Sequence, residues 1–528
     1  MNKAIYIKDW LLFKPYEKQV LTDSYYLKMS NKVKNALISN DKSIVLLNYL
    51  NKEDVNHLAC FLTSYFEDII SETNIWNSFV KIHKRLYNKP LPFYNWDEYY
   101  EDEISTQDVC FLIWYFLSTI QDEKFVYPFD EFIFDIADDV MVVLDEAWEY
   151  APENEYLRSY YQIEKTEDNY YIARNLIDTI LFKTYLFHTD TQFDITVEEI
   201  DILEKYRDDE NLLVYLYDNR DKGIHETRTR LLNLCGKEWA SEIIGSEHPL
   251  RSHFLNLSQK VQSYFLYKGQ DQTDIFIEHI ATEKKFKITK KSYEKYNLLN
   301  EVDKIMFTGI VKWKDEWWFS GINSIKAFNE NFVADEKKSH KSEMALNCLD
   351  HQNKEVTEII KNQLKAFKDF NHGRLIAFLP SNKIDKFLRD YIEFYNKANK
   401  KVKGRIPENS SLDTGNEPFN YSEISETGLV YFNSKSGCEI ALGVNSAFPL
   451  PNNPYFNAEL SVKDFMTLLM SDSTSPELAK FCIENCKKKL PIFNDGVSNF
   501  LLDDLDFLLR FWKNTNYWSK PSITIVGK

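Results

Sequence analysis

Hydrophobic residues in the first half of the chain recur every three or four positions, which is the spacing of helices that bury one face. Over residues 51–72 a helix is predicted to begin after Asn51, whose side chain can cap the first turn. Further helices are predicted over residues 73–87, 105–120, 130–150, 168–188 and 197–217. The pattern predicts an all-α domain over residues 1–250, although successive helices with short links leave a degenerate helical solenoid open as an alternative.

From about residue 261 the pattern changes to short runs rich in β-branched and aromatic residues. Residues 305–313 and 317–322 flank the polar triplet Lys314-Asp315-Glu316, which predicts a β-hairpin. Several short strands in sequence predict a small antiparallel sheet or a partly closed barrel over residues 251–335.

The remaining residues, 336–528, are predicted to form an α+β domain. The expected elements are a helix at 342–370, a strand at 375–379, a helix at 382–398, a hairpin at 429–442 and helices at 461–470, 476–488 and 498–512. Residues 399–427, rich in Gly, Pro, Ser and Asn, are predicted to form a loop. The predicted fold class is therefore α+β and multi-domain, with a mainly helical N-terminal half, a small antiparallel β module in the middle and an α+β C-terminal unit.

Composition predicts a folded chain of several domains. A single core rarely grows beyond roughly 250 to 300 residues, and this chain has 528, of which 44% are hydrophobic. The longest apolar run, Cys110–Leu117, is too short to cross a membrane, and the N-terminus lacks the pattern of a secretory signal. The seven cysteines are scattered, which is typical of reduced thiols. We therefore expect a cytoplasmic protein without membrane association.

The formal net charge of −17 is concentrated in one segment. Residues 101–200 hold 24 acidic residues and 5 basic ones, whereas the other 428 residues hold 57 acidic and 59 basic residues. Within this segment, residues 130–150 combine an apolar helical face with acidic side chains that lie mostly opposite. The acidic residues are Glu131, Asp135, Asp138, Asp139, Asp145, Glu146 and Glu149. They are interpreted as a solvated helix face, as a docking surface for a basic partner, or as a carboxylate metal site. Nucleic-acid binding by the N-terminal half is disfavoured, because acidic side chains repel phosphates.

The β module carries two candidate binding features. Trp313, Trp317 and Trp318 crowd the predicted hairpin, where they supply either the core of a small sheet or an aromatic platform for a base or a peptide. The tract Lys284–Lys291 alternates basic and apolar residues, so a strand there would show a basic face. Such a face is interpreted as solvated or as a surface for nucleic acid or for an acidic protein.

Most motifs that identify an enzyme or a cofactor are absent from the sequence. It contains no phosphate-binding loop, no dinucleotide-binding GxGxxG, no GxSxG, no HExxH and no paired CxxC. No cofactor and no metal site are predicted, and catalytic residues stay unknown. A weak polar cluster of His225, Glu226, Arg228 and Arg230 is interpreted as a helix start with surface charges, or as an anion site or an acid/base pair.

Five stretches of the sequence carry a resemblance to known proteins. They are IYIKDWL (5–11), HLACFLTSYFEDII (57–70), KPLPFY (89–94), FLIWYFL (111–117) and EYAPENEYL (149–157). With these stretches the first third of the chain resembles a bacterial family of conserved proteins of unknown function. The resemblance implies no catalytic or binding residue.

The sequence does not identify the function, and three hypotheses follow from it. The first is an interaction or regulatory protein that offers the acidic helical surface to a protein with a basic surface. The second is a hydrolase or nuclease-like enzyme with a site between the β module and the C-terminal unit, beneath the loop at 399–427. The third is a nucleic-acid-binding protein that uses the basic strand and the tryptophans.

Overall fold

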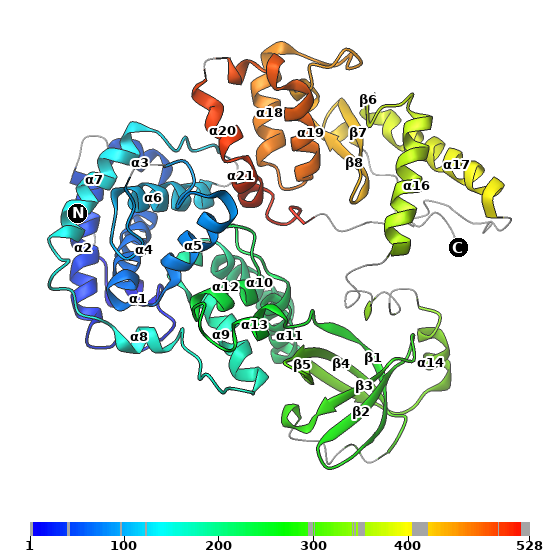
Figure 1. The fold of residues 1–528 in the computed structure, drawn as a ribbon, viewed down its shortest axis with the longest axis horizontal. Helices are drawn as coiled ribbons and strands as arrows, with labels where there is room; N and C mark the ends of the chain where they lie inside the picture. Colours follow the sequence, from blue (N-terminus) through cyan, green and yellow to red (C-terminus); the bar gives the residue numbers. More distant parts are fainter. Residues whose placement is uncertain are drawn as a thin grey trace. The chain divides into compact units, whose positions relative to one another are not determined.

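The structure, a computed structural model, describes residues 4–39, 43–94, 98–121, 124–293, 299, 301–339, 342, 345–346, 354–403, 421–494 and 496–518. The chain divides into two compact units, Met1–His351 (unit 1) and Gln352–Lys528 (unit 2) (Figure 1). The α+β class predicted from the sequence is confirmed, with most of the helices in the N-terminal half and a sheet in each unit. The finer domain boundaries within unit 1 stay a prediction.

Unit 1 opens with helices that pack around a central helix, α6 (Thr106–Gln121), whose run Cys110–Leu117 is completely buried. The longest apolar run of the sequence is thus part of a protein core. Among the described helices, none is long and apolar enough to span a membrane. The other helices of this region are α1 (Ile7–Leu11), α2 (Asp23–Ser39), α3 (Ser43–Tyr49), α4 (Lys52–Ser71), α5 (Ile75–Tyr87), α7 (Glu131–Asp145), α8 (Glu155–Ser159), α9 (Tyr170–Lys183), the 3-10 helix η1 (Tyr185–Phe187), α10 (Thr191–Lys205), α11 (Leu212–Glu226), α12 (Gly236–Ile243) and α13 (Arg251–Leu255).

Helix α4 begins where the sequence predicts it. The side chain of Asn51 accepts hydrogen bonds from two N–H groups of the first turn, at 2.7 and 3.1 Å. These groups have no partner within the helix, so the cap stabilises its start. At the other end of α4, Asp68 accepts the N–H groups of Ile75 and Trp76 at 3.2 and 2.8 Å and thereby caps α5.

The single helix predicted over residues 197–217 is wrong. The structure has two helices, α10 and α11, joined by a turn at residues 206–211. The side chain of Asp209 accepts the N–H of Asn211 at 2.8 Å, which offers the backbone an alternative to the helical hydrogen bond. Apolar residues keep a helical spacing on both sides of this turn, so the hydrophobic pattern alone does not show the break.

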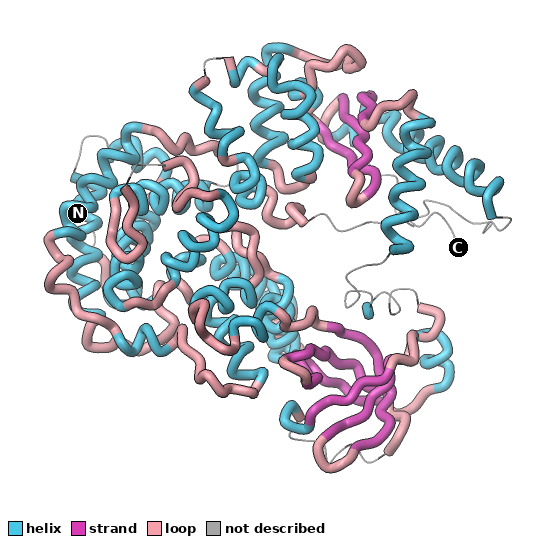
Figure 2. Tube along the Cα trace, in the orientation of Figure 1, coloured by secondary structure: helices cyan, strands magenta, loops and turns pink. Residues whose placement is uncertain are grey.

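The β module of unit 1 is a closed barrel of five strands (Figure 2). The strands are β1 (Val261–Gln270), β2 (Asp274–His279), β3 (Lys285–Thr289), β4 (Ile305–Trp313) and β5 (Glu316–Lys326). Their order around the barrel is β1-β2-β3-β5-β4, with β4 pairing back onto β1. All neighbours are antiparallel except β3 and β5, which are parallel. The hairpin predicted at Lys314-Asp315-Glu316 is confirmed as the β4–β5 connection.

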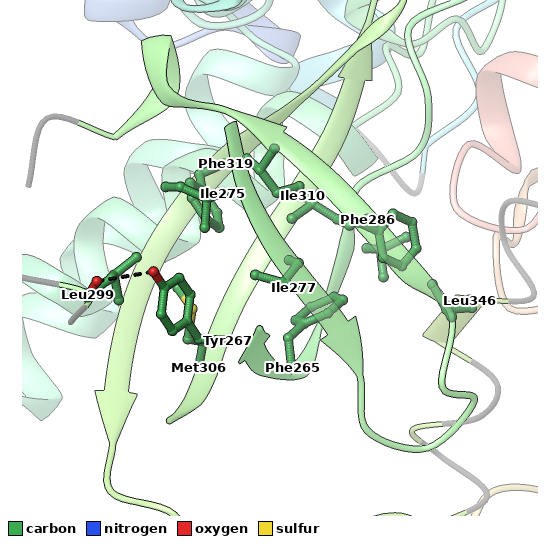
Figure 3. Packing of buried hydrophobic residues seen from close by; sticks show 12 residues of the cluster. Phe265, Tyr267, Ile275, Ile277, Phe286, Leu299, Met306, Ile310, Phe319 and Leu346 are labelled. Carbon is green, nitrogen blue, oxygen red and sulfur yellow. Dashed lines mark hydrogen bonds between the residues drawn. The ribbon is translucent and has the colours of Figure 1, made fainter. Parts of the chain in front are cut away.

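Alternate residues of the strands fill the barrel, as expected for side chains that point in turn to the two faces of a strand. Phe265, Ile277 and Ile310 belong to the buried hydrophobic cluster inside the barrel (Figure 3). The hydroxyl of Tyr267 donates a hydrogen bond to the carbonyl of Leu299 at 3.1 Å, which holds Leu299 against the barrel. A short helix, α14 (Glu330–Glu336), follows β5.

Unit 2 contains a three-stranded antiparallel sheet of β6 (Ile376–Pro380), β7 (Thr427–Asn433) and β8 (Gly437–Leu442), in that order. The strand and the hairpin predicted from the sequence are confirmed. The helices of this unit are α16 (Lys354–Phe370), α17 (Ile384–Lys403), α18 (Ser461–Met470), α19 (Pro476–Cys486), α20 (Phe500–Asp503) and α21 (Leu505–Trp512). Helices α16 and α17 share a core with the sheet, in which Phe367 contacts Tyr391 and Phe432.

The loop predicted at 399–427 is described only at its ends. Helix α17 continues to Lys403, and a 3-10 turn covers Tyr421–Glu423 before β7 begins. Residues 404–420 lie outside the described part of the chain.

Candidate functional site

Helix α7 carries the acidic side chains that the sequence singles out. Its apolar face is buried as predicted, since Phe132, Ile136, Val140 and Leu144 all lie in the core. The neighbouring helices α2, α3 and α6 pack against it. The amphipathic character of this segment therefore holds, and the opposite face of the helix points to solvent.

The acidic surface consists of the seven carboxylates of α7 and of the turns after it. Glu131, Asp138, Asp145, Glu146 and Glu149 are exposed, whereas Asp135 and Asp139 are partly buried. Within the described residues, no Lys, Arg or His forms an ion pair with Asp138, Asp145, Glu146 or Glu149. This differs from many other carboxylates of unit 1, such as Asp178, which lies 2.6 Å from Arg220. The surface can therefore attract cations from outside the molecule.

Two apolar side chains lie among these carboxylates. Val142 is 59% exposed and Tyr150 is 75% exposed. A surface that combines charge with apolar contacts can hold a partner after electrostatic attraction has brought it close.

The three tryptophans of the barrel do not share one environment. Trp313 is fully buried against Phe254 of α13, with ring centroids 5.1 Å apart. Trp318 is also buried and lies edge-on to Tyr171 of α9 at 5.7 Å. Trp317 is half-buried and packs against the barrel core. Of the three, Trp317 is the one that retains accessible surface, so the aromatic platform stays a prediction that depends on this residue.

The polar cluster predicted around His225 is distributed over several contacts. Glu226 is exposed, and the guanidinium of Arg228 donates to the carbonyl of Asn233 at 2.8 Å. Arg230 lies 3.9 Å from Asp190, whose carboxylate also accepts the backbone N–H of Arg230. The grouping of these four residues in one site stays a prediction, while His225 belongs to a different polar group.

That group, which we call the barrel joint, lies where the barrel meets α9 and α11. Tyr170 Oη, His225 Nε2 and Ser320 Oγ lie within 2.9 to 3.2 Å of one another. Ser320 donates to Asp221 at 2.9 Å, and Asp221 forms ion pairs with Arg174 at 2.8 Å and Lys260 at 2.6 Å. The barrel joint consists of Tyr170, Arg174, Asp221, His225, Lys260 and Ser320.

The backbone of β5 is adapted to this cluster. Gly321 has a φ of +75°, a conformation that residues with a side chain rarely adopt. A Cβ at this position would come within 2.7 Å of the Asp221 carboxylate and 2.8 Å of the Lys260 amine. Only glycine lets the strand pass so close to the ion pair.

Opposing effects set the charges of the barrel joint. Burial alone would raise the pKa of Asp221, but the positive charges of Lys260 and Arg174 outweigh it and hold this pKa below its usual value. Burial lowers the pKa of His225 to about 4, although Asp221 acts in the opposite direction. The group therefore contains an ionised carboxylate between two cations, with a neutral imidazole beside it at neutral pH.

The geometry differs from that of a Ser-His-Asp relay. In such a relay the carboxylate orients the imidazole, which takes the proton of the serine. Here the carboxylate of Asp221 accepts a hydrogen bond directly from the hydroxyl of Ser320, without an imidazole between them. Ser320 is also 1% exposed, so a substrate could not reach it without movement of the surrounding segments. The arrangement joins the barrel to the helices by charge-assisted hydrogen bonds.

Replacing His225 with Gln should change how stability depends on pH. In the unfolded chain the pKa of His225 returns to about 6.5. Between pH 6.5 and 4 the unfolded state therefore binds more protons than the folded state, and the wild type loses stability as the pH falls. The variant lacks this loss. Between pH 7 and pH 4.5, we expect the wild type to lose about 2 kcal/mol more of its unfolding free energy than the variant loses. Denaturant titrations at both pH values measure it, and equal pH dependence of the two proteins would contradict a neutral, partly buried His225.

The barrel also bears on nucleic-acid binding. A closed five-stranded barrel in this strand order has the topology of the OB fold, in which the face of strands 2 and 3 binds oligonucleotides or oligosaccharides. The outer side of β2 and β3 carries Lys285 and Lys287, as the basic strand predicts. However, Lys287 pairs with Asp274 at 2.9 Å and Lys285 lies 4.0 Å from Glu278. The basic side chains thus face carboxylates, and nucleic-acid binding here stays a prediction.

A family model gives the relationship of the chain to other proteins. The model described as "Protein of unknown function (DUF3843)" matches residues 4–378. The chain belongs to this family. The match extends well beyond the first third of the chain, over which the sequence resemblance lies, and it ends within β6. No match to the chain was found among curated proteins or among solved structures.

The family description states no activity, so cavities and metal-binding groups are the remaining guides to chemistry. In the described part of the chain, no group of three or more His, Cys, Asp or Glu is arranged to hold a metal ion. A hollow of about 330 Å³ lies between α8 and α9, lined by Tyr156, Tyr160 and Asn175 among others. None of the site residues predicted from the sequence lines it. The hydrolase or nuclease-like site beneath the loop at 399–427 stays a prediction, because the middle of that loop lies outside the described residues.

Sequence reasoning missed most of the barrel joint. Its members come from segments far apart in the chain, and Tyr170 and Ser320 are separated by 150 residues. Lys260 and Asp221 each look like ordinary surface residues in the sequence. The one available signal is His225. The sequence groups it with its neighbours Glu226, Arg228 and Arg230, whereas its structural partners come from α9, from β5 and from one turn earlier on α11.

Proposed function

We propose that this protein is an interaction or regulatory protein that binds a protein with a basic surface through the acidic surface of α7. One observation carries the proposal: exposed carboxylates of this surface, such as Asp138 and Asp145, have no ion-pair partner among the described residues, although the helix beneath them is firmly packed. A fixed helix that presents uncompensated charge favours rapid, salt-sensitive association with a cationic surface. The composition and the family resemblance favour a bacterial cytoplasm as the place of this association.

The test removes charge without touching the core. In the variant Asp138→Asn, Asp145→Asn, Glu146→Gln, three exposed side chains lose their charge and keep their approximate size. Immobilised wild type should retain basic proteins from the native cell at low salt and release them at high salt. For a partner identified in this way, titration calorimetry should show binding to the variant weakened about tenfold at low salt.

A matched variant separates this surface from total charge. Glu301→Gln, Asp315→Asn, Glu330→Gln also removes three exposed charges, but from the barrel and from the start of α14. It should bind the partner as the wild type does. Equal affinity of the α7 variant and the wild type, or equal weakening by both variants, would contradict the proposal.

A further inference from the structure

Helix α10 presents an apolar stripe to solvent. Phe193, Val197, Ile200 and Leu203 recur at helical spacing and are all exposed. The buried residues of this helix, Thr191 and Ile195, lie on the opposite side, where α9 and α11 pack. The helix is thus covered on one side and leaves a second apolar side open.

Helix α11 packs against the covered side of α10, where its Gly223 lies close to Ile195 (Figure 1). Leu213, Val214 and Tyr217 are exposed in its first two turns. The seven large apolar side chains of the two helices are between 41% and 69% exposed. Single exposed apolar residues are common, but four of them at helical spacing on one face of α10 are typical of an interaction surface.

The same surface is strongly acidic. Residues 191–210 contain eight acidic residues and two basic ones. Asp194, Glu198 and Asp201 follow one another at helical spacing beside the apolar stripe, and Glu204 lies at its end. Asp201 and Glu204 are exposed and form no ion pair with a Lys or Arg of the described residues. A partner that covers the stripe must therefore accept carboxylates at its edge.

We infer that the exposed face of helix α10 (Thr191–Lys205) is a docking site for a cationic amphipathic helix of another protein. An apolar face on the incoming helix would cover the stripe, which is about 15 Å long from Phe193 to Leu203 at the rise of an α-helix. Lys or Arg along its borders would meet Asp201 and Glu204. A second copy of this chain fits less well, because two such acidic faces would bring like charges together. The inference concerns a different surface from α7 and does not depend on the proposed function.

The test uses a defined probe and the full chain. The probe is a fluorescein-labelled peptide of 18 residues, with Leu at every third or fourth position and Lys elsewhere, so that it forms a cationic amphipathic helix. Fluorescence anisotropy measures its affinity. The variant Val197→Ser, Ile200→Ser removes apolar surface that is already exposed, so the fold should survive. We expect its affinity to fall at least tenfold.

A second variant tests the charged border. Asp201→Asn, Glu204→Gln should weaken binding about fivefold at low salt and reduce its salt dependence. Two control variants complete the set. Leu21→Ser, Val302→Ser removes two exposed apolar side chains from other parts of unit 1, and the α7 triple variant removes charge elsewhere. Both should keep the affinity of the wild type within twofold.

Three results would overturn the inference. One is an absence of binding to the wild type, which would mean that the exposed face of α10 is not a docking site for such a helix. Another is equal binding of a control peptide in which Ser replaces every Leu, since charge alone would then explain the affinity. The third is a wild-type dimer in sedimentation that the Val197→Ser, Ile200→Ser variant abolishes, because a second copy would then be the occupant.

Discussion

Replacing Lys14 with Met should lower the free energy of unfolding of unit 1 by about 3 to 5 kcal/mol, because it leaves a buried carboxylate without its counter-charge. Lys14 forms an ion pair with Glu67, and both side chains are at most 1% exposed. Glu67 also accepts a hydrogen bond from Asn154 at 2.8 Å, and the Lys14 ammonium lies 3.8 Å from the ring centre of Trp10. Burial raises the pKa of Glu67 even with Lys14 in place. In the variant the carboxyl should take up a proton more readily, so the loss should be larger at pH 8 than at pH 5.

Denaturant unfolding followed by tryptophan fluorescence measures this effect. The double variant Lys14→Met, Glu67→Gln removes both charges and should regain much of the lost stability. The exposed pair of Lys84 and Glu101, 2.8 Å apart, is the matched control, because Lys84→Met should cost less than about 1 kcal/mol. If Lys14→Met cost no more than Lys84→Met, the buried pair would not be held as an ion pair.

The second large effect is expected at the barrel joint, where Asp221→Asn should destabilise unit 1 by about 3 kcal/mol or more. Asp221 is fully buried, and its carboxylate forms ion pairs with Arg174 and Lys260 and accepts a hydrogen bond from Ser320, at 2.6 to 2.9 Å. An amide keeps the shape of the side chain but removes its charge. The amine of Lys260, whose side chain is 5% exposed, is then left in the protein interior with less negative charge beside it.

Asp218 provides a control for this variant on the same helix. Its carboxylate lies 3.8 Å from the same Lys260 amine but is 35% exposed. Asp218→Asn should therefore change the free energy of unfolding by less than about 1 kcal/mol. Thermal and denaturant unfolding of both variants measure the difference. Similar losses for the two substitutions would contradict the central position of Asp221 in the barrel joint.

The sequence predicted most elements whose boundaries depend on local chemistry. The start of α4 at Asn51 and the β4–β5 hairpin at Lys314 follow from a capping side chain and from a polar triplet between two apolar runs. The closure of the barrel could not be predicted, because it depends on long-range pairing of β1 with β4 and of β3 with β5. Such pairing leaves no local signal in one sequence.

The docking surface on α10 shows a different limit of sequence reasoning. The spacing of Val197, Ile200 and Leu203 indicates which side of a helix is apolar, and an apolar side of a helix is usually buried. The structure buries the opposite side through Thr191 and Ile195. Periodicity alone cannot show whether another element covers an apolar face, because this depends on the turn at 206–211 and on the packing of α9.

The barrel joint also has a consequence for synthesis on the ribosome. Ser320 lies 99 residues after Asp221, so a growing chain exposes Asp221 and Lys260 to the ribosome surroundings before the strand that covers them has been made. The N-terminal helices can fold during this interval, since folding of a nascent chain proceeds from its N-terminus. The joint can close only after β5 has left the exit tunnel, so until then the partly made barrel remains open to chaperones and proteases.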